Sequence, residues 1–295
     1  MQSEVEEGEE KMNCTSPFSL DNVTVQASRP TAELEGEEPS TLLTVEALQV
    51  QPGEWVQLIG PNGSGKTTLV RLLTGHLGTG LHVQGQLSRG FAGEEEIAYV
   101  MQHPDAALVG STPREDILMG LELRGLPAAR MPQLLELALA STGLEALADR
   151  PIEQLSGGQK QLTALAGCIA GGAQVLVLDE ATSMLDAESA RLVLYTVREL
   201  HGAGTAVVWV THRQEEWARG DRLIALQKGR IAFDGAIDDF YGGTDGCGAQ
   251  SVCGAMGLPV PEIVQVGLHL RARGYPLQVL PLTALELAEE VGPWR

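Results

Sequence analysis

A glycine-rich loop between a buried strand and an amphipathic helix restricts the fold of this chain more than any other feature. Residues 55–59 form an apolar run typical of a buried strand, and the apolar spacing over residues 66–73 predicts a helix. Residues 60–67 lie between them and fit the pattern G-x-x-x-x-G-K-[ST]. In this context the glycines let backbone N–H groups turn toward an anion, and the helix N-terminus favours negative charge. We therefore predict a polyphosphate site between this strand and this helix.

The loop and the first helical turn are expected to bind the phosphates of ATP, together with Mg²⁺. In phosphate loops of this type the lysine reaches the β and γ phosphates, and the hydroxyl that follows it ligates Mg²⁺. These roles fall to Lys66 and Thr67. An ordinary glycine-rich turn is the alternative, and the flanking strand and helix make it the weaker one. The residues expected to contact the nucleotide here are Gly60, Pro61, Asn62, Gly63, Ser64, Gly65, Lys66, Thr67 and Thr68.

A second apolar strand pattern, at residues 175–178, ends in the carboxylates Asp179 and Glu180. In open α/β sheets, ligands bind at the carboxyl ends of the strands. We therefore expect Asp179 to bind Mg²⁺, and Glu180 to position and polarise the attacking water. Many buried strands end in an aspartate, so the pattern gains its weight from the phosphate loop.

Alternating strand and helix patterns predict an α/β fold with a parallel sheet. A helical pattern at residues 187–200 lies between two strand patterns, and this order gives parallel pairing. Residues 112–172 have mostly helical patterns and are expected to form an insertion in the sheet. The strand patterns besides residues 55–59 lie at 20–25, 42–50, 175–178, 206–210 and 223–226.

Composition divides the chain into four segments. They are an acidic disordered tail at residues 1–17, an α/β domain at 18–241, a glycine-rich linker at 242–256 and a C-terminal helical appendage at 257–295. The α/β domain includes the helical subdomain at about 112–172 and a polar loop at 28–41.

The helical appendage is predicted from two patterns. Ile263, Val266 and Leu270 recur at helical spacing and offer a face to bury. Thr283 and Glu286 are spaced as a capping box at the start of a second helix.

Charge and composition exclude several classes of protein. The formal net charge is −19, whereas proteins that bind nucleic acid normally carry a basic face, so nucleic acid is not expected as a partner. No apolar run approaches the roughly 20 residues of a membrane span, so membrane contact is expected only through a partner. The four cysteines show no CxxC spacing and are expected to be reduced thiols of a cytosolic protein.

A second candidate anion site lies at residues 155–159, Leu-Ser-Gly-Gly-Gln, just before a helical pattern at 160–170. Backbone amides and a hydroxyl at a helix start favour an anion. One chain does not need two phosphate cradles for one nucleotide. We therefore expect Ser156, Gly157, Gly158 and Gln159 to contact the γ-phosphate that is bound by a second copy.

Residues 155–159 resemble the signature motif of ABC ATPases, and other motifs of that family follow in order. Gln102 is similar to the Q-loop glutamine, residues 183–186 with Asp186 to the D-loop, and His212 to the switch histidine. The resemblance covers about residues 20–241 and implies a P-loop NTPase of the ABC ATPase type that works as a dimer. It implies that His212 contacts the γ-phosphate, that Gln102 senses Mg²⁺ or water, and that Asp186 lies at the shared nucleotide.

A narrower resemblance is to the ATPases of energy-coupling factor transporters, which power uptake of vitamins and transition-metal ions. It rests on residues 102–105 (Gln-His-Pro-Asp), on residues 179–186 and on the tail from Gly257 onward. It implies a transmembrane coupling subunit and a substrate-binding membrane subunit as partners, at the cytoplasmic face of the membrane. It also implies a second ATPase subunit, identical or paralogous, with the C-terminal segment helping to hold the pair together.

Two residues depart from the family pattern, and two other functions remain as alternatives. Ala27 stands where the family usually has an aromatic residue that stacks on adenine, and Leu162 stands where an arginine is common. One alternative is a soluble ABC ATPase that acts on nucleic acid or the ribosome, against which the negative charge argues. The other is a nucleotide sensor without hydrolysis, against which Glu180 and His212 argue.

Overall fold

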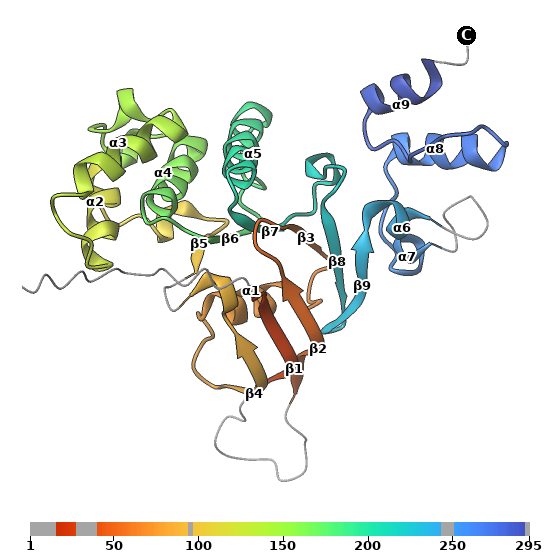
Figure 1. Ribbon diagram of the computed structural model, residues 1–295, viewed down its shortest axis with the longest axis horizontal. Helices are drawn as coiled ribbons and strands as arrows, with labels where there is room; N and C mark the ends of the chain where they lie inside the picture. The colour runs from red at the N-terminus through yellow and green to blue at the C-terminus, as the bar shows by residue number, and fades with distance from the viewer. Residues whose placement is uncertain (1–15, 28–39, 94–96, 243–250, 293–295) are drawn as a thin grey trace, which may run out of the picture.

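The computed structural model describes residues 16–27, 40–93, 97–242 and 251–292, and these include a nine-stranded sheet. Its strand order is β4-β1-β2-β9-β8-β3-β7-β6-β5 (Figure 1). The strands are β1 (Phe18–Ala27), β2 (Thr41–Val50), β3 (Trp55–Ile59), β4 (Leu81–Ser88), β5 (Ala98–Val100), β6 (Val175–Asp179), β7 (Ala206–Val210), β8 (Arg222–Gln227) and β9 (Arg230–Ala236).

The parallel strands β3, β7, β6 and β5 form the part of the sheet that carries the predicted site. β7 lies between β3 and β6, with Trp55 opposite Val207 and Asp179 opposite Val210. Successive residues of β6 enter different cores: Val177 packs on one face of the sheet and Leu178 on the other. Helices on both faces remove both sets of side chains from water, as is usual for parallel strands.

Two layers of helices cover this part of the sheet. Helix α1 (Lys66–Thr74) packs on one face, in the same core as β1 and β2. The opposite face carries α5 (Ala187–Gly202) and the helical subdomain, which appears as a separate group beside β5 in Figure 1. The helices of that subdomain are α2 (Pro113–Leu123), α3 (Met131–Thr142) and α4 (Gly157–Ala170).

The structure contains the strands and helices that the sequence predicted in the α/β part, and it adds three strands. β4, β5 and β9 were not predicted, and β5 pairs parallel with β6. β4 pairs antiparallel with β1, and β9 pairs antiparallel with β8. Thr41, placed in the polar loop, begins β2, while residues 28–39 of that loop lie outside the described residues, as does the acidic tail up to residue 15.

The predicted glycine-rich linker at 242–256 includes residues that form a helix. Its residues 243–250 lie outside the described part, but α7 (Val252–Ala255) follows directly, with Cys253 buried. The short α6 (Ile237–Tyr241) ends the sheet domain, and Phe240 and Tyr241 pack with Cys253 in a third apolar core.

The C-terminal appendage consists of α8 (Glu262–Ala272) and α9 (Ala284–Val291), and it packs against its own domain. Arg219 joins the two parts, donating to the Leu280 carbonyl at 2.8 Å and to Glu286 at 3.0 Å. The capping box is half formed: Thr283 accepts from the Glu286 N–H, but the Glu286 carboxylate accepts from the Leu282 N–H. Across the described residues, no helix is long and apolar enough to cross a membrane.

The buried face of α8 differs from the predicted one. Val264, Gly267 and Leu268 face the third core, whereas Val266 is 44% exposed. The prediction is confirmed for Ile263, which packs against the third core, and is wrong for Val266. It missed Gly267, which carries no apolar side chain, although its backbone lies so close to Pro281 and Leu280 that a side chain would collide with them. Close approach at a glycine leaves no apolar pattern in the sequence.

This packing predicts that two apolar residues of α8 differ sharply in their effect on stability. Leu268→Ala is expected to lower the free energy of unfolding by about 2–4 kcal/mol, because it leaves a cavity in the third core. Val266→Ala is the matched control and is expected to change it by less than about 0.5 kcal/mol. Urea unfolding of the nucleotide-free protein measures both. Equal and small effects would show that α8 does not pack on the domain.

Candidate functional site

The phosphate loop follows β3, and α1 begins at Lys66 as the pattern predicted. Gly65 caps α1 with a φ of 105°, in the left-handed region that other residues rarely adopt. Gly60 has a φ of 146°, and a side chain on it would collide with the Leu226 carbonyl of the adjacent strand β8. The two glycines therefore fix the shape of the loop, and a bulkier residue at either position would strain it.

Lys66 is folded back into this loop. Its buried Nζ donates to the carbonyl of Gly60 at 2.7 Å and to that of Pro61 at 3.3 Å. Burial lowers the pKa of Lys66, while the nearby carboxylates of Glu180 and Asp179 act in the opposite direction. The cation is thus held in a partly desolvated position where an added anion would stabilise it.

Asp179 ends β6 close to this lysine. Burial raises its pKa, and the negative charge of Glu180 raises it further. The hydroxyl of Tyr99 in β5 donates to the Asp179 carboxylate at 3.4 Å, and burial and this carboxylate raise the pKa of Tyr99 to about 12. Tyr99 was not singled out from the sequence; the register of β5 on β6, with Tyr99 opposite Val177, brings it there.

Glu180 and His212 lie side by side at the ends of β6 and β7. His212 Nε2 is 2.9 Å from Glu180 Oε1. Glu180 has a φ of 51°, which is uncommon outside glycine, and its N–H donates to the Val210 carbonyl at 3.0 Å. Strained backbone of this kind clusters at functional sites. The structure thus joins two residues that lie 32 positions apart in the sequence and were both predicted to be catalytic.

Gln102 contacts the turn that follows Glu180. Its Nε2 donates to Ser183 Oγ at 3.1 Å, and the Ser183 hydroxyl donates to the Glu180 carbonyl at 2.8 Å. The predicted Q-loop and D-loop residues therefore meet beside the Glu180 backbone. The role of Gln102 toward Mg²⁺ stays a prediction.

The signature residues begin α4, away from the phosphate loop. Ser156 accepts from the Gln159 N–H at 3.3 Å, and the Gln159 side chain accepts from the Ser156 N–H at 3.0 Å, a complete capping box. Gly158 is buried against Ser189 of α5, where a Cβ would come within 2.6 Å of the Ser189 Cβ. Within the described ranges, no hydrogen bond or ion pair joins Ser156 or Gln159 to the phosphate loop.

The signature and the D-loop form one surface. Asp186 caps α5 by accepting from the N–H groups of Glu188 and Ser189 at 3.1 and 2.9 Å. Leu185 lies within contact distance of Gly157, since a Cβ there would be 3.4 Å from its side chain. Ser156 and Gly157 are exposed on this surface, and Gln159 is half-buried. These exposed residues are accessible to a ligand that is not bound in the phosphate loop of the same chain.

The two residues that departed from the family pattern have different surroundings. Leu162 is buried in the apolar core of the helical subdomain, which accounts for an apolar side chain at that position. Ala27 ends β1, where its N–H donates to the Ser40 carbonyl at 3.0 Å.

The residues of this site fit a nucleotide triphosphate and Mg²⁺. Ser64 Oγ is buried in the loop and has no hydrogen-bond partner among the described residues; a phosphate oxygen would supply one. The raised pKa of Asp179 marks a carboxylate that a divalent cation would stabilise in its charged form. Thr67 is exposed at the start of α1 and supplies a hydroxyl. Mg²⁺ typically takes few protein ligands and completes its shell with water and phosphate oxygens.

Fold and site together define a P-loop nucleoside triphosphatase, and comparison with known proteins narrows the class. The family model described as ABC transporter matches residues 43–183. The energy-coupling factor transporter ATP-binding protein EcfA1 of Levilactobacillus brevis is 34% identical over 287 residues, covering 94% of this chain and 95% of the relative. EcfA1 of Halalkalibacterium halodurans is 35% identical over 258 residues, covering 84% and 90%. This chain therefore belongs to the ABC transporter ATP-binding family, and it is an ATPase.

Solved structures show the same fold. CbiO1 from Clostridium perfringens, part of the ABC transporter complex cbiONQ, superposes with a TM-score of 0.61 at 23% identity, over 75% of this chain and 89% of that one. A dimeric ATP-binding cassette bound to ADP and Pi after hydrolysis superposes with a TM-score of 0.59 at 25% identity, over 75% and 98%. Both are ABC ATPase folds, as the sequence predicted.

The raised pKa of Asp179 predicts that Asp179→Asn stabilises the nucleotide-free protein while removing Mg²⁺-dependent hydrolysis. The ionised carboxylate is less favourable in the folded than in the unfolded chain, because burial raises its folded pKa. Below the unfolded pKa of about 3.9 both states are protonated and the substitution changes nothing. The gain in stability grows as the pH rises from the unfolded pKa to the raised folded pKa, because only the folded chain still holds the proton there, and it is complete above the folded pKa.

Thermal unfolding of the wild type and Asp179→Asn across a pH series measures this gain. Asp149→Asn is the control, because a hydrogen bond from Arg114 lowers the pKa of the exposed Asp149, and no gain is expected there. An Asp179→Asn protein that is no more stable than the wild type at neutral pH would contradict the reading of this carboxylate.

Proposed function

We propose that this chain is the ATP-hydrolysing subunit of an energy-coupling factor type transporter. It works at the cytoplasmic face of the membrane and drives uptake of a substrate, of the vitamin or transition-metal-ion class, through separate membrane subunits. The observation that supports hydrolysis is the 2.9 Å contact between Glu180 and His212. The two residues follow β6 and β7 at the edge of the sheet where the phosphate loop follows β3. The transport role is supported by relatives with 34–37% identity that carry the name of energy-coupling factor transporter ATP-binding proteins.

The phosphates are held by the loop backbone and by Lys66. When a triphosphate enters the loop, Lys66 exchanges its contacts to the Gly60 and Pro61 carbonyls for phosphate oxygens. Thr67 and Asp179 are the protein groups that would hold Mg²⁺, and the ion would supply positive charge against the charge of the phosphates. Most of the catalysis in such a site comes from positioning and fixed charges rather than covalent chemistry.

Glu180 and His212 act on the attacking water and the γ-phosphate. The Glu180 carboxylate orients and polarises the water, and His212 holds the carboxylate and the γ-phosphate in place. The left-handed backbone of Glu180 and its N–H bond to Val210 aim this side chain toward the loop. Gln102, through Ser183, reports occupancy of the site to the rest of the chain.

A second ATPase subunit, identical or paralogous, completes each site. The exposed Ser156 and Gly157 and the half-buried Gln159, with Asp186 beside them, form a helix start of the kind that binds anions. Placed over the phosphate loop of another copy, these groups would bind its γ-phosphate. The partner is supported by the dimeric state of the related ATP-binding cassette.

A transmembrane coupling subunit is proposed to bind beside the Q-loop. A cleft of about 540 Å³ lies between the sheet and the helical subdomain, lined by Met101, Leu108 and Ala164 together with Arg71 and Arg124. Val109 and Leu123, next to cleft residues in the chain, are exposed apolar side chains. Met101 lines the cleft and directly precedes Gln102, so movement of the Q-loop would displace a partner bound in this cleft.

The C-terminal appendage is proposed to support subunit pairing through its outer face. Its inner face packs on its own domain, so Val266, Tyr275 and Leu285 remain exposed on the outside. A second copy of the appendage is the occupant that the family resemblance favours.

The other candidate functions have less support. An ATPase that acts on nucleic acid does not fit the net charge of −19. A nucleotide sensor without hydrolysis does not need the paired Glu180 and His212.

Glu180→Gln tests the proposed function. The amide keeps the shape of the side chain but cannot polarise water, so hydrolysis is expected to fall by about 100-fold or more while ATP affinity stays unchanged. The variant should accumulate as an ATP-bound dimer. Phosphate release, ATP titration and light scattering measure the three effects. Glu145→Gln, an exposed carboxylate on the helical subdomain, is the control and should behave as wild type. Unchanged turnover in Glu180→Gln would remove the assignment.

A further inference from the structure

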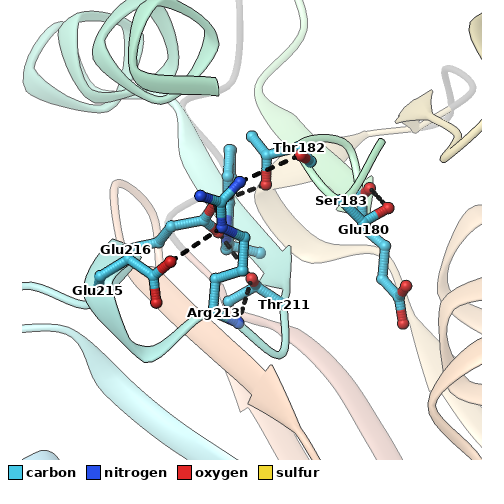
Figure 2. A network of polar contacts seen from close by, with 8 residues as sticks. Glu180, Thr182, Ser183, Thr211, Arg213, Glu215 and Glu216 are labelled. Carbon is cyan, nitrogen blue, oxygen red and sulfur yellow. Dashed lines mark hydrogen bonds and ion pairs between the residues drawn. The ribbon is translucent and has the colours of Figure 1, made fainter. Parts of the chain in front are cut away.

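Glu216 is a buried carboxylate in a network of polar contacts that includes Thr182, Thr211 and Arg213 (Figure 2). It is 5% exposed and lies in the 3₁₀ turn Gln214–Glu216 that follows the switch histidine. Three donors meet it: the Thr182 hydroxyl at 2.6 Å, the Trp209 indole N–H at 2.9 Å and the Thr211 hydroxyl at 2.6 Å. Neither its sequence position nor any motif singled it out.

The two threonines belong to the two segments that carry the catalytic pair. Thr182 comes two residues after Glu180, in the turn at the end of β6. Thr211 comes directly before His212, at the end of β7. Figure 2 shows Glu216 between these two turns. One oxygen of its carboxylate binds the first turn and the other binds the second.

We propose that Glu216 is a positioning residue for hydrolysis, which sets the distance and orientation between Glu180 and His212 by joining the turns that carry them. The proposal rests on the roles proposed above for that pair. Glu216 makes no hydrogen bond or ion pair, within the described part of the chain, with the phosphate loop or with Glu180 and His212 themselves. Its effect therefore passes through the backbone of the two turns.

Neighbouring arginines strengthen this connection. Arg213, directly after His212, donates to the Thr182 carbonyl at 3.3 Å, and its Nε lies 3.5 Å from Glu216 Oε1. Arg198 of α5 donates to the Glu216 carbonyl at 3.3 Å and binds Asp221 with both of its terminal nitrogens. The backbone of Glu216 is therefore fixed to α5, the helix that Asp186 caps.

The chemistry of the donors explains why this position needs an acceptor toward Trp209 but can present either an acceptor or a donor toward Thr182. An indole N–H can only donate, so Trp209 requires an oxygen opposite it. A threonine hydroxyl can donate or accept, so Thr182 could also pair with an amide N–H. Glutamine could therefore preserve both links, with its oxygen toward Trp209 and its nitrogen toward Thr182. Leucine, of similar size, would leave three buried donors without their acceptor.

Turnover and ATP affinity of four variants test the proposal: Glu216→Leu, Glu216→Gln, Thr182→Val and the control Glu215→Gln. The Glu215 carboxylate is mostly exposed and contacts the same Arg213. Glu216→Leu is expected to lower kcat by about tenfold or more with ATP affinity within about twofold of wild type, since small displacements of reacting groups are costly. Glu216→Gln should restore kcat to within about threefold, and Glu215→Gln should match wild type.

Three results would overturn the proposal. They are wild-type kcat in Glu216→Leu, parallel losses of ATP affinity and kcat in that variant, and a Glu216→Gln protein as impaired as Glu216→Leu. If Glu216→Leu does not fold, Thr182→Val decides, because it keeps the carboxylate and cuts the link to the first turn; wild-type kcat there would overturn the proposal. Glu180→Gln in the same assay distinguishes failure of this proposal from failure of the proposed function. Wild-type turnover in Glu180→Gln would contradict the catalytic role of Glu180 and His212, whatever the Glu216 variants show.

Discussion

The parallel pairing of β3, β7 and β6 brings the phosphate loop, Glu180 and His212 to one edge of the sheet. Asp179 lies opposite Val210, so the residues that follow each of them emerge side by side, and His212 reaches Glu180 at 2.9 Å. The register cannot slip by one residue, because Val177 and Leu178 would then exchange their cores. The hydrophobic pattern of three short strands thereby sets the geometry of the catalytic groups.

The charges at this edge are arranged for a ligand rather than for stability. Burial lowers the pKa of Lys66 and raises that of Asp179, so each charged form is less favourable than it would be in water. A triphosphate would stabilise the lysine and a divalent cation would stabilise the aspartate. The buried charges therefore lower the stability of the nucleotide-free protein. Nucleotide and Mg²⁺ offset this cost when they bind together, which is a common trade between stability and activity.

The sequence was sufficient wherever function depends on residues that are neighbours in the chain. The phosphate loop, the two carboxylates after β6 and the signature capping box are local patterns, and the structure forms each of them. β4 and β9 were missed because each contains a glycine and carries few buried side chains, and β4 is exposed along most of its length. β5 was missed because it has only three residues.

Other features depend on contacts between distant segments, which no local pattern records. The inner face of α8 was predicted only in part, at Ile263, because a glycine packs at the centre of that face. Tyr99 and Glu216 gain their importance from residues up to 80 positions away. The proposed contact between Ser156 and another subunit's nucleotide joins two chains, so no pattern within one chain records it. In the single chain, Ser156 is exposed and its hydroxyl accepts from the Gln159 N–H.

Mixing two inactive variants tests the composite site most directly. Lys66→Ala damages the phosphate loop, and Ser156→Arg blocks the signature, so each homodimer has two defective sites. A mixed dimer has both defects in one site and none in the other. If each site uses the loop of one subunit and the signature of its partner, an equal mixture should recover roughly a quarter of the wild-type ATPase rate. A mixture that is no more active than its separate components would contradict the account.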